Sequence, residues 1–241
     1  MLVEIREVAK VRLKNPVIIE GFPGVGMIGT ISSSFLADKL KMKLVGYIQS
    51  SHFPPIAAIH DFVPMSPARI YASEEHNLII LFSEFMIPAE VVYALSQRII
   101  KYAKDKNASE IYSLAGIASQ TPDSKVYGIC STKKMADKLR KFDIELVREG
   151  ATQGVSGILI AECASEGIPA ANLLVQVDLP MAPQRAAMLL NKVKAVVGLD
   201  VDVKQLEAEG KAIQEKIADN MSKIKAMHTD YDEMQNNPAY S

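Results

Sequence analysis

Residues 17–29 of the chain read VIIEGFPGVGMIG and contain the strongest signal of the fold class in the sequence. Residues 17–19 form a continuous apolar run, which predicts a strand covered on both of its faces. Gly24, Gly26 and Gly29 follow in a G-x-G-x-x-G arrangement, and the residues after them predict a helix. A strand, a glycine-rich turn and a helix in this order indicate an α/β layer fold.

Outward from this stretch, short apolar runs alternate with helical segments as far as about residue 200. The further predicted strands are residues 44–48, 78–82, 111–115, 126–129 and 173–177. The predicted helices are residues 89–106 after Pro88, a helix capped by Ser131 or Thr132 that runs to Arg140, and a helix from Gly154 or Ser156 to Glu166. We expect Gly198 to end a last helix. The alternation predicts a mainly parallel sheet with helices on both faces.

The character of the sequence changes after Gly198, and we expect three parts: an α/β core domain over residues 1–200, a helical element over 201–236 and a flexible tail over 237–241. Apolar side chains recur in the helical element at alternating spacings of three and four residues, which is typical of a coiled coil or helical bundle. The two series are Val203, Gly210, Ile217, Ile224 and Tyr231, and Leu206, Ile213, Asn220, Met227 and Met234, and they are interrupted at Gly210 and Asn220. This seam predicts an oligomerisation helix or an antiparallel helical hairpin; a single amphipathic helix that lies on its own domain is the alternative.

The composition narrows the class of protein. Lys and Arg number 27 and Asp and Glu 28, so the formal net charge is −1. A protein that binds nucleic acid through its phosphates carries a basic excess, so we expect no nucleic-acid partner. The sequence has no apolar run of membrane-spanning length and no signal-peptide pattern, so we expect a cytoplasmic protein without a membrane partner. Cys130 and Cys163 are too few for a disulfide framework.

The segment with the most prolines is residues 50–69, which read SSHFPPIAAIHDFVPMSPAR. Its four prolines make regular structure unexpected there. Its apolar side chains are either buried against the body of the domain or take part in a subunit contact. These side chains are Phe53, Ile56, Ile59 and Phe62.

The glycine turn matches the fingerprint of a dinucleotide site only in part. Such a site needs an acidic residue about 20 residues further on to hold the ribose, and the corresponding residues 47–51 read YIQSS. A Walker phosphate loop is excluded, because no Gly-Lys-Ser/Thr follows the glycines. We interpret the turn as structural, with glycines that permit close contact between strand and helix. Its residues are Gly21, Pro23, Gly24, Gly26 and Gly29.

The other reactive residue types do not form a catalytic or metal-binding set. Ser131 and Lys134 match S-x-x-K, but the partner motifs of serine acyl-transfer enzymes are absent. His52 and His60 flank the proline-rich segment, and zinc would need a third ligand. We therefore expect no catalytic residue, no metal and no cofactor. The alternative is a nucleotide- or nucleoside-binding enzyme that uses the turn at residues 24–29 and the polar loop at residues 119–123.

Three segments carry a resemblance to a known family. They are residues 21–29 (GFPGVGMIG), residues 114–116 with the stretch up to 128, and residues 154–159 (GVSGIL) continuing to 167–170 (GIPA). Together they resemble the proteasome assembly chaperone 2 family in its archaeal branch, over about residues 15–200. The resemblance implies a phosphorylase-like three-layer α/β/α sandwich, used as a scaffold rather than an enzyme in homo-oligomers or heterodimers.

The chain ends in Ala239, Tyr240 and Ser241. This end resembles the hydrophobic–tyrosine–any-residue tail with which activators dock between proteasome α-subunits, although Ala239 is smaller than the usual first residue. An aromatic ring with a polar tip and a terminal carboxylate fits a pocket that carries a lysine. The resemblances together imply a non-enzymatic, homo-oligomeric chaperone or adaptor in proteasome assembly or activation. Its expected partners are further copies of itself and core proteasome α-subunits or another chaperone protein.

Overall fold

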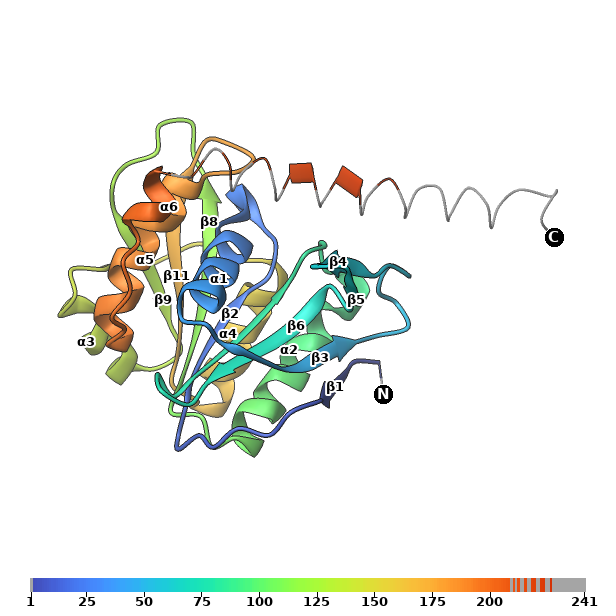
Figure 1. The fold of residues 1–241 in the computed structure, drawn as a ribbon. Helices are drawn as coiled ribbons and strands as arrows, with labels where there is room; N and C mark the ends of the chain where they lie inside the picture. The colour runs from blue at the N-terminus through green and yellow to red at the C-terminus, as the bar shows by residue number, and fades with distance from the viewer. Residues whose placement is uncertain are drawn as a thin grey trace.

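The computed structural model describes residues 2–208 and, further along the chain, residues 210, 212, 215, 218, 219, 222, 223 and 226. One large sheet forms the centre of the molecule, and helices cover both of its faces (Figure 1). Within the described residues the sheet has nine strands. In spatial order they are β1 (Glu4–Glu7), β3 (Lys43–Gln49), β6 (Ala68–Ser73), β7 (Leu78–Ser83), β2 (Val17–Gly21), β8 (Glu110–Ala118), β11 (Ala170–Val177), β9 (Val126–Cys130) and β10 (Glu145–Leu146).

The sheet is mixed, and the prediction of a mainly parallel sheet was wrong. β2 is parallel to β7 and β8, β8 to β11, and β9 to β10, whereas β1–β3, β3–β6, β6–β7 and β9–β11 are antiparallel pairs. Only residues 74–77 connect β6 to β7, and a connection this short permits an antiparallel pair but no parallel crossover. The sequence analysis placed no strand at β1 or β6, which take part in three of the four antiparallel pairs, and for the two predicted strands β9 and β11 it took the wrong relative direction.

The predicted layers are present. On one face lie α1 (Ile28–Lys39), α3 (Lys133–Arg140), α5 (Pro183–Val197) and α6 (Lys204–Ala208); on the other lie α2 (Ala89–Asp105) and α4 (Gly154–Glu166). Alternate residues of the central strands supply the two cores, since Ile19 packs with the first group and Ile18 with the second. The expected helix ends are also confirmed. The Thr132 side chain accepts the Met135 N–H at the start of α3, and Gly198 ends α5 with φ 83°.

The proline-rich segment is more regular than predicted. It contains a hairpin of β4 (Ala58–His60) and β5 (Val63–Met65), and β6 begins at Ala68. Pro64 lies within β5, where an edge strand tolerates the missing N–H. The hairpin turns through Asp61 and Phe62, which have φ of 47° and 67°.

The start of the C-terminal helical element packs on the body. Val203 and Leu206 are buried in the core beside α5, and Gly210 is buried where an added Cβ would lie 3.1 Å from Pro183 Cγ. The remaining predicted seam residues and the tail lie outside the described residues. They are Ile213, Ile217, Asn220, Ile224, Met227, Tyr231 and Met234, with Ala239, Tyr240 and Ser241.

Candidate functional site

Four parallel strands, β7, β2, β8 and β11, end at one edge of the sheet, which we call the carboxyl edge. Open α/β sheets bind their ligands in crevices at this edge. The glycine turn follows β2 there, the polar loop 119–123 follows β8, and the residues before α5 follow β11. The carboxyl edge therefore collects the segments that the sequence analysis singled out.

The glycine turn brings α1 into backbone contact with the sheet. A Cβ on Gly21 would lie 2.0 Å from Ser33 Oγ and 2.3 Å from the Gly29 carbonyl oxygen. A Cβ on Gly29 would lie 2.6 Å from the carbonyl oxygen of Leu114 in β8. These distances are far shorter than real contacts, so neither position accepts a side chain in this geometry.

The space beside Gly26 is filled by another part of the protein, the side chain of Val177. Gly26 has φ 67° and lies so close to Val177 that a Cβ would be 2.9 Å from its Cγ2. In a dinucleotide site the second fingerprint glycine lets the backbone approach the pyrophosphate, whereas here the Val177 side chain lies against it. Gly24 faces open space, and Pro23 is half-buried beside it. The turn is therefore built for contact between strand and helix.

A polar network fixes the loop after β8. Tyr127 donates to Asp123 Oδ2 at 2.5 Å, and Gln176 Nε2 donates to the Tyr127 hydroxyl at 3.2 Å. Arg185 on α5 donates to the carbonyl oxygens of Pro122 and Asp123. The hydrogen bond from Tyr127 lowers the pKa of the Asp123 carboxyl, so this loop carries a negative charge at neutral pH.

A shallow, mostly apolar pocket lies between these segments at the carboxyl edge. Its volume is about 510 Å³. Its lining includes Val25, Gly26, Ala118, Val177 and Leu179. Val25 and Leu179 are exposed in the protomer, at 39% and 53% of their surface. The chemistry of the lining suits an apolar side chain better than a phosphate.

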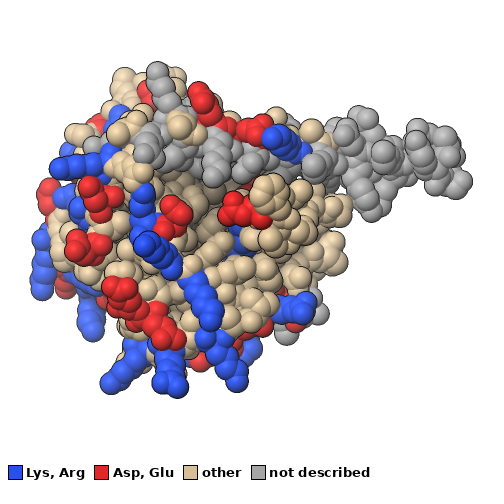
Figure 2. Space-filling model, viewed as in Figure 1, with Lys and Arg blue, Asp and Glu red and all other residues tan. Residues whose placement is uncertain are grey.

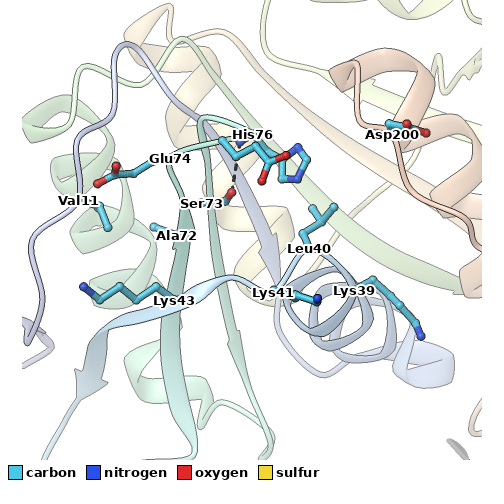
Figure 3. A pocket seen from close by; sticks show the side chains of 11 residues that line it. Val11, Lys39, Leu40, Lys41, Lys43, Ala72, Ser73, Glu74, His76 and Asp200 are labelled. Atoms are coloured by element: carbon cyan, nitrogen blue, oxygen red, sulfur yellow. Dashed lines mark hydrogen bonds between the residues drawn. The ribbon is translucent and has the colours of Figure 1, made fainter.

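A second pocket, of about 700 Å³, lies at the opposite edge of the sheet (Figure 3). Lys41 and Lys43 lie on one side of the pocket, and Glu74 and Asp200 lie on two further sides. The His76 side chain extends from the turn where its backbone N–H donates to Ser73 Oγ. Charges of both signs surround the opening without converging on one point, so this pocket indicates no particular ligand.

Glu20 is a buried carboxyl next to the glycine turn. Its side chain accepts hydrogen bonds from the Phe22 N–H at 3.0 Å and from Ser156 Oγ on α4 at 3.1 Å. Burial raises the pKa of this carboxyl despite these bonds. Glu20 thus ties the turn to α4 from inside the protein and faces no solvent.

Neither the two cysteines nor the described histidines of the proline-rich segment form a reactive cluster. Burial raises the pKa of Cys130 to about 11 and that of Cys163 to about 12, so both remain thiols at neutral pH. His60 contacts Glu84, and His52 is exposed. Over the part of the chain that the structure describes, no three His, Cys, Asp or Glu residues gather as a metal site would require. None of the described helices is long and apolar enough to cross a membrane.

The two most exposed large apolar side chains of the described residues, Phe62 and Ile59, are on the hairpin. Ile59, Phe62 and Val63, which we call the hairpin tip, are 72%, 99% and 56% exposed. Figure 2 shows that the part of the surface where β4 and β5 lie in Figure 1 is mostly free of charged residues in this view. Of the four apolar residues that the sequence analysis named in residues 50–69, Phe53 and Ile56 pack against the body and Ile59 and Phe62 do not. The expected burial is therefore confirmed for Phe53 and Ile56, whereas a subunit contact stays a prediction for the exposed Ile59 and Phe62.

Three other exposed apolar residues at the carboxyl edge were missed in the sequence. Val25, Met86 and Leu179 each follow within four residues of the end of β2, β7 or β11. The sequence signal that could have identified them is an apolar residue within a few positions after the end of a buried strand. Together with the hairpin tip they give this edge an apolar character, which is typical of a protein-interaction surface.

Comparison with known proteins identifies the class. The model of the PAC2 family matches residues 18–221. The chain belongs to the PAC2 family.

Its relatives cover almost the whole length of the chain. It is 31% identical over 212 residues to the uncharacterized protein MJ0106 of Methanocaldococcus jannaschii, covering 88% of this chain and 87% of that one. It resembles the crystal structure of Pyrococcus furiosus PbaA, an archaeal homolog of proteasome-assembly chaperone, with 30% identity, a TM-score of 0.80, and 97% and 99% of the two chains covered. Pyrococcus furiosus PbaB, an archaeal proteasome activator, shares the fold at 20% identity with a TM-score of 0.75, covering 90% and 98%.

Proposed function

We propose that the chain is a non-enzymatic, homo-oligomeric chaperone or adaptor that acts in proteasome assembly or activation in the cytoplasm. The observation that carries the proposal is the 30% identity to PbaA over nearly the full length of both chains. The apolar carboxyl edge supports it, because such a surface suits a protein partner. The filled space beside Gly26 and Gly29 argues against the alternative of a nucleotide site.

Self-association is assigned to the C-terminal helical element. Val203 and Leu206 fix its start on the body, so the following helix would leave each protomer from a defined position. The seam residues Ile213, Ile217 and Ile224 would then pair with those of other copies.

The tail residues Ala239, Tyr240 and Ser241 are the proposed docking element for core proteasome α-subunits. Ordering a short flexible peptide lowers its affinity, so a single tail binds weakly. Several tails on one assembly act together and raise the affinity by about 10²–10⁴-fold where their linkers reach. Oligomerisation and docking are therefore coupled in this proposal.

The test is native mass measured on the chain alone and mixed with purified core proteasome. Deleting residues 237–241 should abolish binding and leave the mass of the assembly unchanged. Tyr240→Ala should have the same effect, and Ser241→Ala, at the unconstrained last position, is the matched control. Binding that survives the deletion removes the tail from the mechanism.

A thermal-shift panel of nucleotides and nucleosides tests the non-enzymatic part. A ligand present at 100 times its Kd would stabilise the protein by about 2.7 kcal/mol. We expect no shift, and a reproducible one would favour the enzyme.

A further inference from the structure

We infer that the β4–β5 hairpin of one copy inserts Phe62 into the carboxyl-edge pocket of the next copy. This contact rests on the proposed self-association but assigns part of it to the α/β body, at a surface separate from the C-terminal helix. The occupant of the pocket is a second copy of this chain.

The hairpin tip takes no part in either core cluster of the described residues. Phe62 is 99% exposed and makes no core contact, and Ile59 and Val63 beside it are mostly exposed. Phe62 also has φ 67°, a left-handed conformation that bulky residues rarely adopt and that two-residue hairpin turns give to glycine. An aromatic side chain held outward at a position suited to glycine indicates that something outside the protomer uses it.

The hairpin is held in place before any partner arrives. Arg69, whose side chain is 4% exposed, forms an ion pair with Glu84, and Glu84 Oε1 lies 3.0 Å from His60 Nε2. Arg69 Nη1 also donates to Met65 Sδ at 2.9 Å. His60 is in β4 and Met65 in β5, so both strands are tied to the sheet. A rigid protruding element loses little conformational entropy on docking.

The pocket matches the hairpin tip in chemistry and size. Its lining is mostly apolar, with Ser119, Gln120 and Asp178 as the polar members; the others are Val25, Gly26, Ala118, Val177, Leu179 and Pro180. Its volume of about 510 Å³ lies within the roughly 300–1,000 Å³ of pockets that enclose small molecules. It therefore has room for the Phe62 ring together with one aliphatic neighbour.

The geometry requires two different copies. Glu84 holds the hairpin beside the end of β7, whereas the pocket lies at the ends of β8 and β11, with β2 between them. A projection and a pocket at separate places on one chain give a heterologous contact, which closes into a ring or continues as a filament. The net charge of −1 imposes little long-range repulsion between identical copies.

Disulfide trapping tests the contact directly on the full-length chain. Phe62→Cys and Leu179→Cys are made as separate variants, mixed and mildly oxidised. Because Cys130 and Cys163 are half-buried and buried, the introduced thiols should react first. The mixture should give a crosslinked dimer that neither variant gives alone. Val8→Cys, an exposed position at the opposite edge of the sheet, replaces Phe62→Cys as the control and should give none.

Dilution of the assembly gives the second readout. Phe62→Asp should raise the concentration at which the assembly dissociates at least about tenfold, as for a central anchor residue, while Val8→Asp leaves it unchanged. Phe62 contacts no core, so the variant folds, and circular dichroism verifies this. A wild-type assembly that Phe62→Asp does not weaken, or a Phe62→Cys variant that crosslinks only with itself, overturns the contact. A wild-type chain that is monomeric at every concentration overturns the proposed assembly and this contact together.

Discussion

The glycine turn and the hairpin tip lie at the same edge of the sheet and solve opposite problems. In the turn, Gly21 and Gly29 give up their side chains so that the backbones of β2, α1 and β8 can touch. In the hairpin, Phe62 occupies a conformation that suits glycine and leaves its ring in solvent. A residue that stabilises the protomer is thus recognised by the atoms packed against it. A residue that binds a partner is recognised by an exposed side chain and an unfavourable backbone conformation that no contact among the described residues explains.

The largest expected effect is that of a single methyl group in the glycine turn. Gly21→Ala places a Cβ 2.0 Å from Ser33 Oγ, so α1 must move away from the sheet. We expect a loss of about 3 kcal/mol or more in the free energy of unfolding, measured by urea titration. Gly24→Ala, with open space around it and an extended backbone at φ −161°, should change it by less than about 0.5 kcal/mol. Equal effects of the two substitutions would contradict the structural interpretation of the turn.

The hairpin anchor should give the next largest effect. Glu84→Ala leaves the buried Arg69 guanidinium without its carboxylate, and we expect a loss of about 2–3 kcal/mol. Hydrogen exchange should also show faster exchange at residues 58–65, because both strands of the hairpin are tied through this cluster. Asp105→Ala, which removes the exposed ion pair with Lys101, is the control and should cost less than about 0.5 kcal/mol. Unchanged exchange in the hairpin would show that the cluster does not hold it.

The layers were predictable because their signals are local. Continuous apolar runs marked the buried strands, and Thr132 and Gly198 marked helix ends with side-chain and backbone chemistry that acts within a few residues. Strand direction depends on the lengths of connections, and missing β6 hid the short connection that makes its pair with β7 antiparallel. The prolines masked the hairpin, since Pro64 argues against a strand unless the strand is an edge.

For the apolar surface at the carboxyl edge, the sequence predicted which residues are apolar but not which of them are exposed. Phe53 is covered because its ring packs against Phe85, with centroids 4.9 Å apart, a contact across distant parts of the sequence. Ile59 is also a large apolar residue of the proline-rich segment, yet its side chain remains exposed. Burial of an apolar residue in a loop is decided by which distant element lies beside it, and periodicity within the loop carries no such information.

A smaller effect, which depends on pH, is expected for the buried carboxyl beside the turn. Burial raises the pKa of Glu20 in the folded chain above that of the unfolded chain. Its contribution to stability is therefore complete at a pH below the unfolded-state pKa and is lost as the pH rises through the folded-state pKa. Glu20→Gln stays neutral and can keep the bonds with the Phe22 N–H and Ser156.

Relative to wild type, the Glu20→Gln variant should gain on the order of 1 kcal/mol between pH 4 and pH 8, read from urea titrations at each pH. Glu149→Gln, on an exposed loop, controls for the loss of one negative charge. A difference between Glu20→Gln and wild type that stays constant across this range would mean that Glu20 is equally ionised in the folded and unfolded chain.

The smallest effect tests the comparison most directly, because it asks whether Phe62 serves the protomer at all. Phe62→Gly gives the hairpin the Asp-Gly pair that two-residue turns with positive φ favour. The ring is 99% exposed and belongs to neither core cluster of the described residues. We therefore expect a gain of about 0.5 kcal/mol, because the greater freedom of glycine in the unfolded chain offsets part of the relief of backbone strain. Phe62→Ala, which removes the ring and keeps the Cβ, should give no gain. Thermal unfolding at a concentration where the protomers are separate makes the measurement independent of assembly. A loss of stability in Phe62→Gly would place the ring in the protomer's own packing and remove the contrast between the two regions.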